Sequence, residues 1–156
     1  MEKTKTGIKT LNVAIKKLNE KAETPKYKIF SDSGCDLVCC ADVTIPVGQI
    51  KLVGTGISIK IPHGYEAQIR PRSGLAAKHG VSVINSPGTI DSDYTGEVKV
   101  ALIILGSAPL TIKKGEAFAQ MVFCPVYKAV FHEVADLDLT CRGDGGFGHT
   151  DKFGDK

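Results

Sequence analysis

The amino-acid sequence predicts an all-β protein, either a sandwich, a jelly roll or a barrel. Short runs of apolar and β-branched residues follow one another from Tyr27 onward, and several alternate apolar with polar side chains. Glycine or proline stands at nearly every joint between these runs. Many short strands at this spacing are typical of such β architectures. One stretch of helix formers, at residues 73–80, predicts a single short helix or helical turn.

Composition limits the class of protein. Of the 156 residues, 42% are hydrophobic and 24% are charged, as in an ordinary soluble domain. Lys and Arg exceed Asp and Glu by 20 − 17 = 3, too few to indicate a nucleic-acid or membrane surface. No apolar run approaches the roughly 20 residues that span a bilayer, and no apolar leader follows Met1. The five cysteines lack zinc-site spacing, so we expect reduced thiols and a cytoplasmic protein, also nuclear in a eukaryote.

Three regions are expected along the chain. Residues 1–10 form a polar tail, residues 11–140 a folded domain, and residues 141–156 a flexible Gly-rich arm with almost no aliphatic side chains. The start of the domain is ambiguous. Leu11, Ile15 and Leu18 fit a helix, whereas Leu11, Val13 and Ile15 fit a strand. The pattern alone slightly favours the helix.

The remaining elements follow from periodicity and from turn residues. Alternating apolar residues at 81–83 and 98–104 flank the Ser86-Pro87-Gly88 breaker and predict a hairpin with one buried face. Ser73 as a cap and Gly80 as a stop delimit the short helix. Further strands are predicted at 37–39, 43–45, 49–53, 57–61, 65–69, 110–112, 117–123 and 126–134.

The polar residues of the predicted hairpin suggest a nucleotide site. The amide of Asn85 offers a donor and an acceptor together, which suits the edge of a nucleobase. The carboxylate of Asp91 can position and deprotonate a water. The ring of Tyr94 can lie flat against a sugar. On this segment alone, an ordinary loop and turn explain the same residues equally well.

Two other segments fit a phosphate group. Arg72, Ser73 and Gly74 combine a guanidinium, a hydroxyl and backbone amides at the start of the predicted helix. A capped helix with a surface arginine is the competing interpretation. The C-terminal arm could fold over a phosphorylated ligand through Arg142, Phe147, Gly148, His149 and Thr150, and a disordered tail is the alternative. The Gly-rich stretch does not indicate a Rossmann site, because no βαβ unit surrounds it.

Five segments, in this order, resemble the five motifs of the trimeric dUTP pyrophosphatase (dUTPase) family. They are 33–37, 71–76, 85–96, 115–120 and 142–149. The likeness covers roughly residues 11–150. It implies a jelly-roll or β-clip homotrimer whose three active sites are each built from three chains. It also implies a strand, rather than a helix, at the start of the domain.

The family resemblance implies hydrolysis of dUTP to dUMP and pyrophosphate by Mg²⁺-dependent attack of water on the α-phosphorus. This reaction limits uracil incorporation into DNA and supplies dUMP for thymidylate synthesis. The matching positions imply Asp91 as the base, and Asp36 as a Mg²⁺ contact through water. The remaining positions imply substrate contacts: Asn85, Gly88 and Ile90 for uracil, Tyr94 for deoxyribose, Arg72, Ser73, Gly74 and Gln120 for phosphates and water, Arg142, His149 and Thr150 for the γ-phosphate, and Phe147 with Gly148 for closure over the base.

Two other functions stay open on the sequence. A dCTP deaminase of the same fold, including a bifunctional one, shares the phosphate-binding serine but needs a different acid–base set. A non-catalytic, nucleotide-binding regulatory trimer would have a damaged base or clamp, whereas Asp91 and Arg142 are both present.

Overall fold

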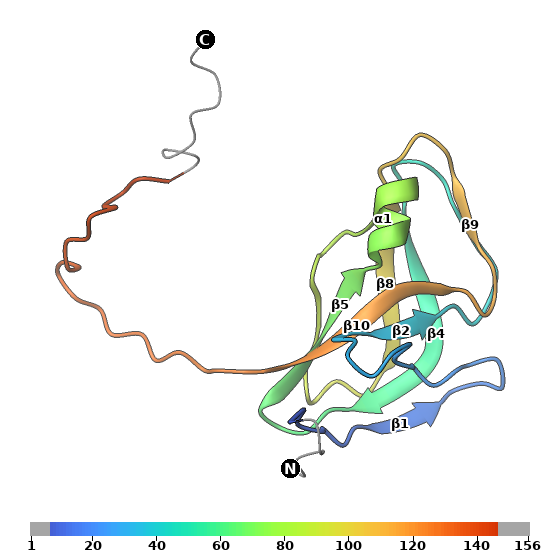
Figure 1. Cartoon of the computed structure of the whole chain (residues 1–156), viewed down its shortest axis with the longest axis horizontal. Coiled ribbons are helices and arrows are strands. Elements are labelled where there is room, and N and C mark those ends of the chain that lie inside the picture. The colour runs from blue at the N-terminus through green and yellow to red at the C-terminus, as the bar shows by residue number, and fades with distance from the viewer. Residues whose placement is uncertain (1–6, 147–156) are drawn as a thin grey trace.

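The computed structural model of the protein describes residues 7–146, and Figure 1 shows a β-rich body from which the C-terminal segment extends. Two four-stranded sheets have the orders β1–β4–β8–β6 and β2–β10–β5–β7, and β3 pairs with β9. The elements are β1 (Ala14–Lys17), β2 (Cys35–Val38), β3 (Val43–Ile45), β4 (Ile50–Lys60), β5 (Tyr65–Pro71), α1 (Ser73–His79), β6 (Val81–Val83), β7 (Gly88–Ile90), β8 (Glu97–Ile104), β9 (Leu110–Ile112) and β10 (Ala117–Pro125).

One hydrophobic core joins the two four-stranded sheets, because their strands bury alternate side chains. In β8, the side chains of Val98, Val100, Leu102 and Ile104 are all buried. Burying apolar side chains in this way is the main force that holds such sheets together. The predicted all-β class with one short helix is therefore confirmed. Within residues 7–146, no helix is long and apolar enough to span a lipid bilayer.

The predicted hairpin is more elaborate than its sequence suggests. Strands β6 and β8 do pair antiparallel, with Val81 opposite Ile104. The connection between them does not turn directly, however. It crosses to the second sheet, where β7 pairs antiparallel with β5. Strand β7 begins at Gly88, the last residue of the Ser-Pro-Gly breaker, so its sequence indicates a turn rather than a strand.

Strand β4 joins two stretches that the sequence divides at Gly54. The pairing with β8 shifts register between Gly54 and Ser58, as in a β-bulge. Two hydrogen bonds hold this irregularity. The hydroxyl of Thr55 donates to the carbonyl of Val98 (2.7 Å), and the backbone N–H of Gly56 donates to the carboxylate of Glu97 (3.0 Å). Strand β4 therefore continues through the bulge, where glycine allows the local bend.

Three local predictions are wrong. The N-terminal helix favoured by pattern is the strand β1, as the family resemblance implied, and its apolar residues were too few to choose between the periods. Ser73 does not cap α1; Arg72 occupies that position and no side chain caps the helix, although Gly80 ends it in the left-handed conformation as expected. Residues 126–134 form no strand in the chain as described, and Tyr127 and Phe131 there are 91% and 93% exposed.

The cysteines of the described chain are free thiols, in agreement with the sequence. Cys35 and Cys39 are buried. Burial raises the pKa of the Cys35 thiol above its ordinary value of 9.0, because the low-dielectric interior disfavours a thiolate. These two side chains pack as small apolar groups.

Candidate active site

Three polar side chains form a row across the outer face of the second sheet. Gln120 of β10 lies opposite Asp36 of β2 on one side and opposite Arg70 of β5 on the other. Their neighbours along each strand, among them Cys35, Ile69 and Met121, point into the core and are buried. The two-residue period of the strands therefore gathers polar groups from segments more than 80 residues apart onto one surface.

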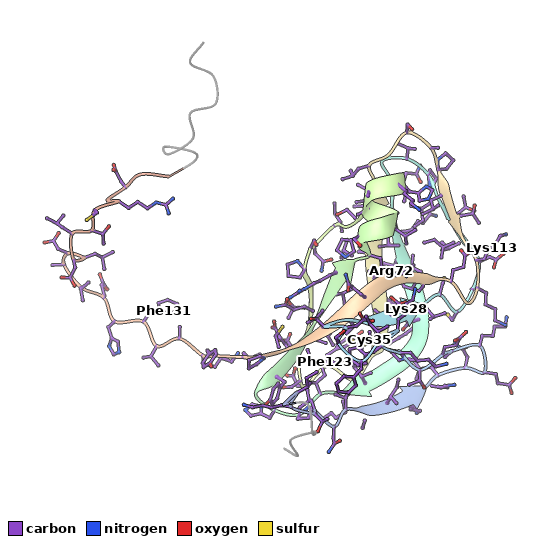
Figure 2. The ribbon with its side chains drawn as sticks, viewed as in Figure 1. Lys28, Cys35, Arg72, Lys113, Phe123 and Phe131 are labelled. Carbon is purple, nitrogen blue, oxygen red and sulfur yellow. The ribbon has the colours of Figure 1, made fainter. Side chains whose placement is uncertain are left out.

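Arg72 ties the end of β5 to this row. Its Nε lies 3.0 Å from Oδ1 of Asp36, and its Nη1 donates to the backbone carbonyl of Ala117 (2.7 Å). The Asp36 and Arg72 side chains are only 19% and 27% exposed, which limits competition from water. Arg72 is thus held by two partners, and Figure 2 shows it near Lys28 on the body of the protein.

Gln120 is also held by a backbone carbonyl. Its Nε2 donates to the carbonyl of Pro71 (2.9 Å), directly before Arg72 and Ser73. Gly34 leaves room for this amide, because a Cβ atom at Gly34 would lie 2.5 Å from Oε1 of Gln120. The glycine of the first motif and the glutamine of the fourth are therefore shaped to fit each other.

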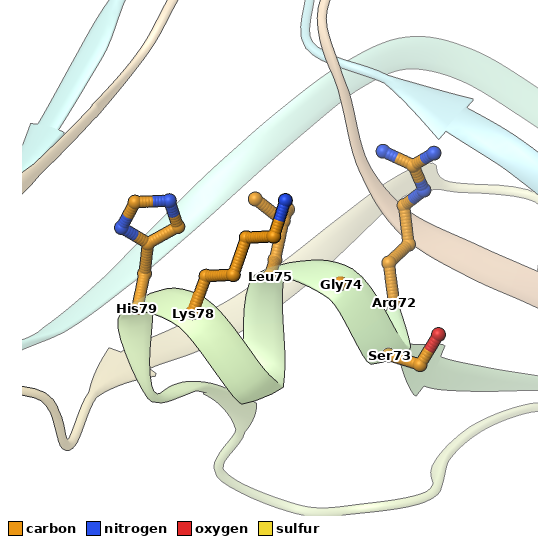
Figure 3. A pocket seen from close by; sticks show the side chains of 6 residues that line it. All are labelled: Arg72, Ser73, Gly74, Leu75, Lys78 and His79. Carbon is orange, nitrogen blue, oxygen red and sulfur yellow. The ribbon is translucent and has the colours of Figure 1, made fainter.

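Helix α1 borders the same region and carries the proposed phosphate cradle. A hollow along it is lined by Arg72, Ser73, Gly74, Leu75, Lys78 and His79. Ser73 and Gly74 are exposed at the first turn, and a Cβ added at Gly74 would meet no atom within 4 Å. Figure 3 shows Arg72, Lys78 and His79 projecting from one side of α1. This positive surface beside a free hydroxyl suits an anionic group.

The segment predicted to bind the base forms a second, separate cluster around β7. The amide of Asn85 packs against Gly88, where an added Cβ would meet its Nδ2 at 3.4 Å and its Oδ1 at 3.5 Å. The ring of Tyr94 folds over Gly96, and its hydroxyl donates to the carbonyl of Glu97 (2.9 Å). The backbone N–H of Tyr94 donates to the carbonyl of Asp91 (3.2 Å).

The accessibility of this cluster agrees with a binding surface. Asn85 and Asp91 are exposed, Tyr94 is 45% exposed, and Ile90 is half-buried. A carboxylate and an aromatic ring held by a hydrogen bond thus face solvent in the same segment as an exposed amide. These are groups that can receive the base and sugar of a nucleoside.

Within one chain, Asp91 lies far from the phosphate cradle. In the β5–β7 pairing Ile90 lies opposite Ala67, whereas the cradle follows Pro71, four residues further along β5. At about 3.3 Å per residue, Ala67 and Pro71 are about 13 Å apart along β5. Asp91 follows Ile90 and Ser73 follows Pro71, and the two lie further apart still. A base must come within hydrogen-bonding distance of its water, so these two residues of one chain cannot serve the same phosphorus.

The C-terminal segment carries a third group of predicted residues away from the body. In Figure 1 the chain after β10 extends outward. Arg142 is exposed there, and its Nε donates to the carbonyl of Gly145 (2.8 Å). The predicted residues Phe147, Gly148, His149 and Thr150 lie outside the described residues. The structure thus brings Asp36, Arg72, Ser73, Gly74 and Gln120 together, and leaves the β7 cluster and Arg142 apart from them.

The side chains of the candidate site fit Mg²⁺ only through a water-mediated contact. Among residues 7–146, no three His, Cys, Asp or Glu side chains are grouped closely enough to hold a metal ion. Asp36 can still receive a hydrogen bond from metal-bound water at the rim of the hollow that it lines with Gln120. Magnesium keeps several waters and prefers substrate phosphates as ligands, so a single carboxylate reached through water is sufficient.

Sequence reasoning missed several residues of this surface. Lys28 and Asp32 line the hollow with Asp36 and Gln120, and Lys78 and His79 line the one along α1. Lys28 Nζ lies 3.5 Å from Oδ2 of Asp36. Lys28 precedes the first motif by several residues and belongs to a local Lys-rich stretch, which gives no signal of a site.

The fit between Gly34 and Gln120 leads to a stability prediction. Gly34→Ala would displace the Gln120 amide and break its bond to Pro71, lowering the free energy of unfolding by about 1 kcal/mol. The same change in a Gln120→Ala background should cost less than half as much, because the amide is already gone. Urea unfolding of the four proteins measures this coupling. Equal losses in both backgrounds would show that Gly34 does not serve Gln120.

Comparisons with known proteins identify the family of this sequence. The dUTPase family profile matches residues 20–151. The chain is 52% identical over 142 residues to the deoxyuridine 5'-triphosphate nucleotidohydrolase of Nautilia profundicola, covering 91% of this chain and all of that protein (100%). It is 54% identical to the protein of the same name from Hydrogenobaculum sp., covering 90% and 98% of the two chains.

Solved structures share the fold. The dUTPase of Staphylococcus bacteriophage 80alpha, solved with dUpNHpp, superimposes with a TM-score of 0.80 at 21% identity, covering 90% of this chain and 99% of that one. The dUTPase from phage phi11 of S. aureus superimposes with a TM-score of 0.74 at 19% identity, covering 82% and 99%. The predicted jelly-roll or β-clip fold is confirmed. With a family match across most of its length and relatives at about half identity, this chain belongs to the dUTPase family.

Proposed function

We propose that the protein is a dUTP diphosphatase, which hydrolyses dUTP to dUMP and pyrophosphate. The observation that carries this proposal is the family membership together with an intact set of site residues. Its relatives are named deoxyuridine 5'-triphosphate nucleotidohydrolases. Asp91, Ser73 and Gln120 each carry a side chain that suits the proposed reaction. A location in the cytoplasm is part of the proposal.

In the proposed mechanism, Asp91 orients the attacking water and accepts its proton as the water attacks the α-phosphorus. The hydroxyl of Ser73 and the backbone N–H of Gly74 donate to phosphate oxygens, on which negative charge develops. Gln120 supports the phosphates and water, and Arg72 holds Asp36 in place beside them. When bound, Mg²⁺ would neutralise phosphate charge, with Asp36 contacting it through water. The phi11 phage relative coordinates a structural Mg(II) ion.

Selectivity for the nucleoside comes from the β7 cluster. The amide of Asn85 and the backbone of Gly88 and Ile90 can pair with the acceptor–donor–acceptor edge of uracil. Cytosine would leave some of these groups unpaired, and an unpaired buried polar group costs about 1–3 kcal/mol. The ring of Tyr94, held by its bond to Glu97, packs under deoxyribose and leaves no space for a 2′-hydroxyl.

The separation between Asp91 and the cradle supports a site shared between chains. We propose a homotrimer in which one chain supplies Asp36, Arg72, Ser73, Gly74 and Gln120, and a second supplies the β7 cluster. The arm of a third, residues 141–156, closes over the nucleotide. Arg142, Phe147, Gly148, His149 and Thr150 belong to this arm in the proposal.

Exposed apolar surface supports association of copies. On the outer face of the first sheet, Leu52 of β4 lies opposite Ala101 of β8, and Ile84 donates its backbone N–H to Ala101. Leu52 is 69% exposed, Ile50 is 54% exposed and Ile84 is 49% exposed. A contiguous apolar face of this kind is typical of a surface that another chain covers.

A substrate panel tests the proposed function. We expect pyrophosphate release with Mg²⁺ from dUTP, and at least about 100-fold slower release from dCTP, dTTP and UTP, because a site built to pair with one base edge rejects others strongly. Ammonia release from dCTP would instead show a deaminase. The absence of turnover, with nucleotide binding retained, would favour a regulatory trimer.

A substitution tests the assigned base. Asp91→Asn keeps the size and exposure of the side chain but cannot accept the proton, so turnover should fall about 10²–10⁴-fold while nucleotide binding persists. Asp93→Asn is the matched control, since Asp93 is exposed two residues further on in the same loop. Steady-state kinetics and calorimetric binding separate the two effects. Wild-type turnover in Asp91→Asn would refute the assignment.

Mixing two inactive variants tests the shared site. Asp91→Asn and Ser73→Ala are each expected to be nearly inactive alone. Refolded together from urea in equal amounts, they should recover about a quarter of the wild-type rate, because by random assortment one site in four combines an intact base with an intact cradle from another chain. Each variant refolded alone provides the background. A mixture no more active than that background would place both residues in a site formed by one chain.

A further inference from the structure

The loop before β2 places a lysine beside the phosphate-binding surface. Lys28 Nζ lies 3.5 Å from Oδ2 of Asp36, while Arg72 Nε lies 3.0 Å from Oδ1 of the same carboxylate. Figure 2 shows Lys28 and Arg72 over the same part of the body. A single carboxylate therefore has two cationic neighbours, one on each oxygen, and the three groups together carry a surplus of one positive charge.

The backbone around Lys28 is held in place. The carboxylate of Asp32 accepts the backbone N–H groups of Lys28 (3.1 Å) and Ile29 (2.9 Å). The backbone N–H of Asp36 donates to the carbonyl of Lys26 (3.0 Å). The position of Lys28 beside Asp36 is therefore fixed by the fold of the loop on both sides, rather than by its own ion pair.

The two cations differ in how tightly they are bound. Arg72 is 27% exposed and has a second partner in the carbonyl of Ala117. The Lys28 side chain is 66% exposed, and it pairs with Asp36. An exposed Lys–Asp pair contributes only about 0–1 kcal/mol. Lys28 can therefore exchange one partner for another at little cost, whereas Arg72 cannot.

We propose that Lys28 is a further substrate-binding residue, which contacts Asp36 in the free protein and the triphosphate chain when nucleotide is bound. Lys28 lines one hollow with Asp32, Ser33, Gly34, Asp36 and Gln120. Asp32 is negative, but its Oδ2 is occupied by the two backbone N–H groups. A triphosphate carries several negative charges and is a stronger partner for an ammonium group than one carboxylate already paired with arginine.

The inference rests on the proposed function, because it assumes a triphosphate in this hollow. It adds a residue that lies outside the five motifs. Contacts to the β- and γ-phosphates would distinguish a triphosphate from a monophosphate product. Lys28 would thus favour binding of dUTP over binding of dUMP.

Calorimetric titration with dUpNHpp and with dUMP tests Lys28. Lys28→Gln keeps much of the side chain's length and removes its charge. We expect about threefold to tenfold weaker binding of dUpNHpp and less than about twofold change for dUMP. Lys28→Arg should bind dUpNHpp within about twofold of wild type, because it retains the charge.

Lys113→Gln is the matched control. Lys113 Nζ forms an ion pair with Oδ2 of Asp42 (3.0 Å), and its side chain is 63% exposed, close to the 66% of Lys28. Figure 2 shows it at another edge of the body. The Lys113→Gln variant should bind dUpNHpp and dUMP as the wild type does.

Three results would overturn the inference. Wild-type affinity of Lys28→Gln for dUpNHpp would show that Lys28 is only a surface ion pair. Equal weakening of dUpNHpp and dUMP would show that it shapes the site without contacting the outer phosphates. If wild-type protein bound neither nucleotide, the proposed function would fail together with this inference, whereas the first two results leave the function standing.

Discussion

The simultaneous pairing of β5 with β10 and with β7 is the constraint on which the rest of the site depends. Pairing with β10 places Gln120 beside the end of β5 and opposite Asp36, so the phosphate-binding side chains meet there. Pairing with β7 in the antiparallel sense sends Asp91 toward the other end of β5. One strand therefore creates two half-sites and keeps them apart. In the proposed function, this register is the reason that a complete site needs more than one chain.

Much of the fold follows from local pattern. The strands at 43–45 and 110–112 have the predicted bounds, since alternation and flanking Gly or Pro define them without ambiguity. The failures occur where local pattern carries too little information. Strand β7 begins within a turn signal, at Gly88, and the bulge in β4 depends on Thr55 and Glu97, whose partners lie about 40 residues away. The apolar residues at 126–134 predict a strand, but a strand needs a neighbour, and the described chain offers none there.

The candidate site, like the fold, could be predicted from the sequence only in part. Residue chemistry alone suggested a nucleotide at Asn85, Asp91 and Tyr94, but could not join them to Asp36 or Gln120, because strand register decides such neighbours. The family resemblance supplied that connection. Neither residue chemistry nor the family resemblance indicated Lys28, because it lies in a loop without a periodic pattern and outside the five motifs. Only the geometry of its ion pair with Asp36 reveals it. In a β protein, contacts between residues far apart in the chain are the hardest feature to predict from the sequence.

Each half-site is already ordered within its own chain. Arg72 is held by Ala117, Gln120 by Pro71, and Tyr94 by Glu97, in every case through a backbone carbonyl. These bonds form when the domain folds, so the entropy of fixing the side chains is lost before nucleotide arrives. Assembly then brings two rigid surfaces together, and preorganised donors need little rearrangement as charge develops on the phosphates. Lys28 has no such backbone partner among its described contacts, and in our proposal this freedom lets its ammonium group move from Asp36 to the substrate.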